Sequence, residues 1–140
     1  MSPSVYVLEP QALFIPEINR IVSCAGGHVM RSAQCVDAEE IASLRADYAI
    51  LDLDYSELGV LDGLACFQAL AQAVKAIVVT EEHDAERLAS FRDAGATTVF
   101  SKAMTSDALQ RSLRDIFHEQ AHAAFPSAAP KRRVYAGARG

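Results

Sequence analysis

Five short hydrophobic runs are spaced along the chain, and the stretches between them have the hydrophobic spacing of helices. The runs lie at residues 5–8, 28–33, 48–51, 76–79 and 98–101, and their β-branched and aromatic residues are typical of strands. Apolar residues recurring at every third or fourth position predict helices at about residues 17–25, 38–45, 63–73, 85–94 and 106–125. Because parallel strands need crossover connections, the alternation predicts an α/β fold: one doubly wound, five-stranded parallel sheet with helices on both faces.

Capping residues support these helix boundaries. Asp37 and Glu40 have the spacing of a capping box. Asp84 is a second predicted N-cap, and Thr105 or Ser106 is the expected N-cap of the last helix.

Four predicted strands end in a residue that can do chemistry. Glu9 follows the first run, Asp52 the third, Thr80 the fourth and Lys102 the fifth. We expect these side chains to lie together, because ligands bind at the carboxyl ends of the strands in open α/β sheets. A carboxylate nucleophile, a second carboxylate for Mg²⁺, a hydroxyl and an ammonium suit an acyl-phosphate site, since phosphoryl transfer depends mainly on positioning and charge neutralisation.

The order and spacing of these four residues make residues 4–125 resemble the CheY-like receiver domains of two-component response regulators. Two further motifs support the resemblance, Asp62-Gly63-Leu64 after the third strand and Ala94-Gly95-Ala96 before the fifth. The resemblance implies a flavodoxin-like sheet with strand order 2-1-3-4-5. A simpler interpretation also stays open, in which Lys102 is a salt-bridge partner of Asp52 whether or not phosphate ever binds.

The resemblance also implies a role for each site residue. Asp52 is the expected phosphoacceptor, Thr80 the switch hydroxyl and Lys102 the lysine that binds the phosphoryl group. Glu9, Asp52 and Asp54 are the expected ligands of a weakly bound Mg²⁺, with Asp54 contributing its backbone or its side chain.

Several residues depart from the family pattern. Pro10 replaces the second acid that usually ends the first strand, which lowers the expected affinity for Mg²⁺, with the charge of Asp54 as partial compensation. Glu81 follows Thr80, where the family has a small residue, and its carboxylate would repel a phosphoryl group. The sequence therefore predicts an atypical receiver.

The resemblance implies a signalling module rather than an enzyme, whose only catalysis is Mg²⁺-dependent phosphorylation of itself from a phosphodonor. Its expected partners are a histidine kinase or phosphotransfer protein, and an output domain or partner protein that it controls. A homodimer is a further option. The alternative is a pseudo-receiver that works without phosphorylation, as an interaction or localisation module of a pilus assembly ATPase.

Composition and charge argue against several other classes of protein. The chain has 140 residues with a formal net charge of -5, which argues against nucleic acid as a partner. It shows neither a signal-peptide pattern nor an apolar run long enough to cross a bilayer, so we expect a cytoplasmic protein with no membrane partner. The three cysteines lack C-x-x-C spacing, which predicts reduced, mostly buried thiols.

Charge is divided unevenly along the chain. All 18 acidic residues precede residue 126, whereas four of the 13 basic residues follow it: Lys131, Arg132, Arg133 and Arg139. We therefore expect a receiver domain over residues 1–125 and a linker with a basic tail over residues 126–140. Alternatively, the tail begins a truncated second domain, since residues 131–140 resemble the junction in CpaE/TadZ-type pilus assembly ATPases between an atypical receiver and a MinD-like ATPase domain.

Overall fold

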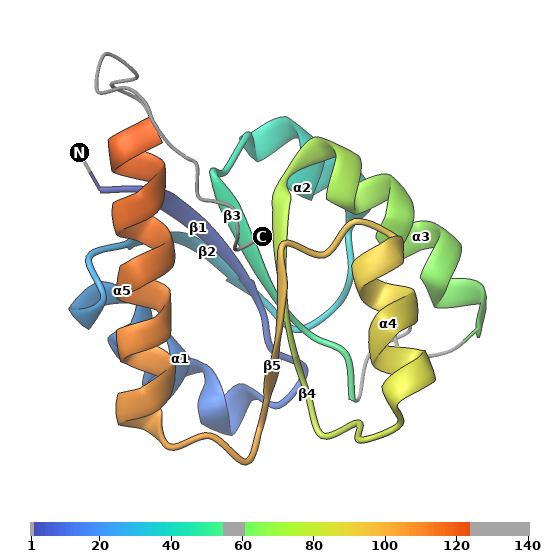
Figure 1. Cartoon of the computed structure of the whole chain (residues 1–140). Helices are drawn as coiled ribbons and strands as arrows, with labels where there is room; N and C mark the ends of the chain where they lie inside the picture. Colours follow the sequence, from blue (N-terminus) through green and yellow to red (C-terminus); the bar gives the residue numbers. More distant parts are fainter. Residues whose placement is uncertain (1, 55–60, 124–140) are drawn as a thin grey trace.

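The computed structural model describes the backbone of residues 2–54 and 61–123 (Figure 1). Its elements are β1 (Ser4–Leu8), the 3₁₀ helix η1 (Ala12–Phe14), α1 (Ile15–Cys24), β2 (His28–Ala33), α2 (Ala38–Leu44), β3 (Tyr48–Asp52), α3 (Leu61–Ala73), β4 (Lys75–Thr80), α4 (Ala85–Asp93), β5 (Thr98–Ser101) and α5 (Ser106–Ala123). The five strands form one sheet in the order β2-β1-β3-β4-β5, with every pairing parallel. The predicted fold class and strand order are confirmed, and η1 is an addition to the predicted elements.

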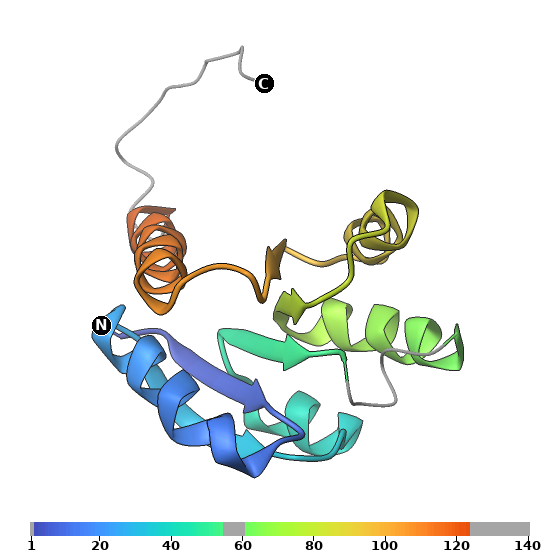
Figure 2. The ribbon, with the colours of Figure 1, turned by 90° about the horizontal axis from the view of Figure 1, so that it is seen from below.

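The sheet lies between two layers of helices, with α1 and α5 on one face and α2, α3 and α4 on the other (Figure 2). Successive side chains of a strand point to opposite faces, so each central strand contributes to both cores. In β1, Val5 and Val7 pack toward α1 and α5, whereas Tyr6 and Leu8 pack toward the opposite layer. This double burial explains why β1, β3 and β4 are hydrophobic almost throughout.

Aromatic contacts join the helices to these two cores. Phe67 of α3 meets Phe91 of α4 edge to face, with ring centroids 5.6 Å apart. On the other face, Phe117 of α5 packs on Tyr48 of β3 at 5.2 Å. All four side chains are almost completely buried, so Phe67, Phe91 and Phe117 lie on the helix faces that cover the sheet.

The predicted caps form, with one difference. The Asp37 carboxylate accepts the backbone N–H of Glu40 at 3.0 Å, and Thr105 Oγ1 accepts that of Ala108 at the start of α5. The Glu40 carboxylate binds Tyr6 and Arg31 rather than completing a capping box. Burial and this carboxylate raise the pKa of Tyr6 to about 12.

The exposure of two cysteines differs from the prediction. Cys24 and Cys35 are free thiols but exposed, so the prediction of mostly buried thiols is wrong for these two: Cys24 ends α1, and Cys35 follows β2.

Across the described ranges, no helix is both long and apolar enough to cross a membrane. The predicted linker and basic tail, residues 126–140, lie outside the described residues.

Strand register aligns the carboxyl ends of the central strands. Leu8 pairs with Leu51, Asp52 pairs with Val79, and Thr80 pairs with Ser101. The ladder continues past the strands, where Glu9 N–H donates to the Ala33 carbonyl and Lys102 N–H to the Thr80 carbonyl. One edge of the sheet therefore presents the ends of four neighbouring strands to the same space.

Candidate functional site

The structure brings the predicted site residues together at this edge. Glu9, Asp52 and Thr80 are the buried polar or charged residues among those described, each with no more than 5% of its surface exposed. Each directly follows or ends a hydrophobic strand, so the strand core fixes its backbone while its polar end faces the edge.

Lys102 reaches from the end of β5 to two carboxylates. Its Nζ lies 2.7 Å from Asp52 Oδ2 and 2.8 Å from Asp54 Oδ2. Burial lowers the pKa of Lys102, but the hydrogen bonds and negative charges of the two aspartates outweigh burial and leave the pKa raised. Lys102 is therefore a permanent cation that neutralises this acidic edge.

The Asp54 carboxylate accepts hydrogen bonds from three donors at the site. Its Oδ1 accepts the Thr80 hydroxyl at 2.7 Å, both of its carboxylate oxygens accept the Glu81 backbone N–H at 3.0 and 3.1 Å, and Oδ2 binds Lys102. Burial raises the pKa of Asp54, but the bonds from Lys102, Thr80 and Glu81 outweigh it and hold the pKa below its ordinary value. Asp54 is thus an ionised acceptor enclosed by donors.

A short turn points Asp54 in this direction. The Asp54 backbone N–H donates to Asp52 Oδ1 at 2.9 Å, which closes a turn directly after β3. Asp52 therefore has both carboxylate oxygens engaged, Oδ1 by this N–H and Oδ2 by Lys102.

The Thr80 hydroxyl is held at both its donor and its acceptor side. Its oxygen accepts the Glu82 backbone N–H at 3.0 Å, and its proton goes to Asp54. A hydroxyl with an occupied acceptor side directs its proton to the remaining partner. The Thr80 side chain therefore points into the site.

Glu9 completes the acidic edge beside Asp52. Burial raises the pKa of Glu9, the Gln11 backbone N–H opposes that shift, and the negative charge of Asp52 adds to it, so the net direction is upward. The Gln11 N–H donates to Glu9 Oε2 at 3.0 Å. The neighbouring charge of Asp52 therefore disfavours the ionised form of Glu9.

These residues do not fit Mg²⁺ in the arrangement described. Asp54, one of the three predicted ligands, uses both carboxylate oxygens on Thr80, Glu81 and Lys102. The Lys102 ammonium already supplies the positive charge between Asp52 and Asp54. Over the described ranges, moreover, no group of three or more His, Cys, Asp or Glu could hold a metal ion. The arrangement described therefore gives no support to the predicted Mg²⁺ site.

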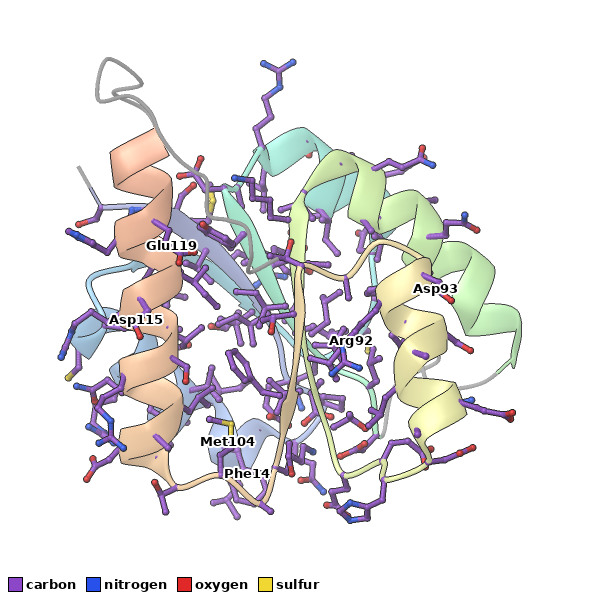
Figure 3. All side chains as sticks on the ribbon, viewed as in Figure 1. Phe14, Arg92, Asp93, Met104, Asp115 and Glu119 are labelled. Atoms are coloured by element: carbon purple, nitrogen blue, oxygen red, sulfur yellow. The ribbon has the colours of Figure 1, made fainter. Side chains whose placement is uncertain are left out.

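Two cavities flank the site. One of about 510 Å³ has Glu9, Asp52 and Lys102 at its polar end, and its apolar wall includes Phe14 and Met104, both labelled in Figure 3. The other, of about 530 Å³, lies on the α4 side and is lined by Leu53, Asp54, Thr80, Glu81, Glu82, Arg87 and Phe91. Solvent-sized molecules can therefore approach from both sides.

Sequence reasoning missed the hydrogen bonds that Asp54 and Glu81, which lie just beyond the ends of β3 and β4, make at the site. Asp54 was expected beside a metal ion, and the structure instead turns its carboxylate to Thr80 and Lys102. The repelling carboxylate expected at Glu81 stays a prediction: the residue is exposed and lines both cavities, while its backbone N–H donates to Asp54. The signal available in the sequence was the acid placed two residues after Asp52, opposite a hydroxyl and a lysine.

Comparison with known proteins supports the fold. Neither a protein-family model nor a curated protein matches the sequence, whereas many solved structures match the fold. A CheY-like response regulator receiver domain protein from Methanospirillum hungatei is 17% identical over 88% of this chain and 99% of its own, with a TM-score of 0.68. The signal receiver domain of the response regulator NarL from Mycobacterium tuberculosis is 18% identical over 84% and 97%, with a TM-score of 0.69.

A third neighbour is a pilus assembly-related protein from Burkholderia pseudomallei, 20% identical over 84% of this chain and 90% of its own, with a TM-score of 0.67. The structural neighbours and the strand order agree, and together they show that this chain has the fold of the CheY-like response regulator receiver domains.

Proposed function

We propose that this chain is an atypical receiver domain of the two-component type, with Asp52 as its phosphoacceptor. The observation that supports this most strongly is the meeting of Asp52, Thr80 and Lys102 at one sheet edge, with Lys102 Nζ 2.7 Å from Asp52 Oδ2. An acyl phosphate needs a carboxylate beside a cation and a hydroxyl donor, and these three strand ends supply them.

In the proposed reaction, an Asp52 carboxylate oxygen attacks the phosphorus of a phosphohistidine on a kinase or phosphotransfer protein. A P–O bond to Asp52 forms as the P–N bond breaks, and the departing imidazole takes a proton from solvent. Lys102 and Thr80 neutralise charge on the transferred oxygens, which is the main requirement of phosphoryl transfer. The domain then controls an output domain or partner protein through its helical faces.

Intact mass after incubation with acetyl phosphate and Mg²⁺ tests this proposal. Wild type should gain the mass of one phosphoryl group, and Asp52→Asn should gain none. Asp115→Asn, a change at an exposed carboxylate of α5, is the control and should be labelled like wild type (Figure 3). An unlabelled wild type, or an Asp52→Asn variant labelled like wild type, would contradict the assignment of Asp52.

A second candidate function is a pseudo-receiver that works without phosphorylation, as a module for interaction or localisation in pilus assembly. It is favoured by the contacts of Asp54, whose carboxylate engages the Thr80 hydroxyl and the Lys102 ammonium. The pilus assembly-related neighbour gives it a cellular context. This candidate predicts that Asp52→Ala leaves the chain's oligomeric state and cellular localisation unchanged.

A further inference from the structure

Three donors at the end of β4 and β5 converge on one carboxylate. They are the Thr80 hydroxyl, the Glu81 backbone N–H and the Lys102 ammonium, at 2.7, 3.0 and 2.8 Å from the nearest Asp54 oxygen. We call these three groups the anion cradle. A hydroxyl, an amide and an ammonium around one point are the donors that bind a phosphoryl group or another oxyanion.

Geometry places the cradle where a phosphoryl group on Asp52 would lie. Lys102 Nζ is within 2.8 Å of an oxygen of Asp52 and of an oxygen of Asp54. A phosphoryl group attached to Asp52 would need the same ammonium and hydroxyl that Asp54 now uses. Asp54 and such a group therefore compete for the same donors.

The local backbone holds Asp54 in this position. The bond from its N–H to Asp52 Oδ1 directs the side chain back over the sheet edge, and the Thr80 hydroxyl is oriented toward it by the Glu82 N–H. The Asp54 side chain is 14% exposed, so water competes poorly for these bonds. The Asp54 contacts are enclosed, and the bond from the Lys102 ammonium is charge-assisted, so they differ from an exposed surface ion pair.

We propose that the anion cradle is an oxyanion-binding site that the chain fills with its own Asp54, which stands in for a phosphoryl group. The domain thereby holds the Thr80 hydroxyl and the Lys102 ammonium on an oxyanion of its own. A free oxyanion enters only when Asp54 is removed or displaced, and the adjoining cavity of about 530 Å³ gives it a route. The inference takes from the proposed function the identity of the group that Asp54 replaces, whereas the cradle itself is open to test without phosphoryl transfer.

Titration with inorganic phosphate, followed by the backbone amide resonances of Glu81 and Glu82, tests the proposal. In Asp54→Ala, phosphate should shift both resonances saturably, with an affinity at least about tenfold above that of wild type, because the competing carboxylate is gone. Before phosphate is added, the Glu81 resonance of this variant should differ from wild type, and bound phosphate should move it back. Asp54→Asn keeps the shape of the side chain without its charge and should bind phosphate with intermediate affinity.

Asp115→Ala is the matched control, since it removes one negative charge from the exposed surface of α5 (Figure 3). It should bind phosphate no better than wild type. Equal phosphate affinity in wild type and both Asp54 variants would overturn the inference. So would a Glu81 amide resonance with the same chemical shift in Asp54→Ala as in wild type.

The outcome is independent of the proposed function. Tighter phosphate binding in Asp54→Ala, together with no acyl phosphate on Asp52 of wild type, would support the inference about the anion cradle and reject Asp52 as the phosphoacceptor. Labelling of Asp52 in wild type, together with unchanged phosphate affinity in Asp54→Ala, would do the reverse.

Discussion

Replacing Lys102 by methionine removes the cation on which the acidic edge depends. The substitution keeps most of the side-chain volume but leaves the carboxylates of Glu9, Asp52 and Asp54 close together without the ammonium that pairs with Asp52 and Asp54. The Asp52 side chain is only 5% exposed, so water cannot take over the role of the ammonium there. Native-state repulsion should follow.

The expected cost lies between two limits. Removing one partner of a buried ion pair costs about 3–5 kcal/mol, whereas an exposed pair is worth about 0–1 kcal/mol. Lys102 is 22% exposed and serves two carboxylates, so we expect Lys102→Met to lower the free energy of unfolding by about 2–3 kcal/mol at neutral pH.

Urea unfolding followed by circular dichroism measures this cost. Arg20→Met, which breaks the exposed pair with Glu17, is the control and should lower the free energy of unfolding far less than Lys102→Met does. In an Asp54→Asn background, Lys102→Met should cost at least about 1 kcal/mol less, because one of the repelling charges is gone. A cost equal to that of Arg20→Met, or additive effects in the double variant, would refute the reasoning.

Two further predictions concern the core and alkaline pH. A Cβ added at Gly27 would lie 2.9 Å from both Val22 and Phe117, so Gly27→Ala should cost about 1–3 kcal/mol in the same urea assay, and unchanged stability would contradict this packing. The pKa of Tyr6 is about 12 in the folded chain, against an ordinary value of 10.0. The protonated Tyr6 therefore contributes fully to stability below pH 10. This contribution is lost as the pH rises through 12, by at most about 1.4 kcal/mol per pH unit. The difference in absorbance at 295 nm between wild type and Tyr6→Phe during a pH titration isolates Tyr6 from the other tyrosines of the chain, and Glu40→Gln should lower the pKa of Tyr6. A Tyr6 that ionises at its ordinary pKa in wild type would contradict the burial argument.

The sequence predicted the fold and the position of the site because both follow from strand patterning. A hydrophobic run that ends in Asp52 or Thr80 specifies a buried strand whose last side chain faces the carboxyl edge, and parallel pairing brings such ends together. The same logic placed Glu9 and Lys102. The functional roles assigned to these residues stay predictions.

The contacts of residues outside the strands could not be derived in this way. The direction of Asp54 depends on a turn closed by its own N–H, and the inward N–H of Glu81 depends on the backbone after β4. Hydrophobic periodicity carries no information on either. Glu40 is a similar case, because Tyr6 and Arg31 take its carboxylate away from the helix end.

A crystal structure of the wild-type chain, grown with Mg²⁺ and without a phosphodonor, tests the central claim most directly. The prediction is an Asp54 carboxylate within hydrogen-bonding distance of Thr80 Oγ1, the Glu81 N–H and Lys102 Nζ, where 2.7, 3.0 and 2.8 Å are expected. An Asp54 side chain turned away from the anion cradle, with Mg²⁺ bound between Glu9 and Asp52, would contradict it.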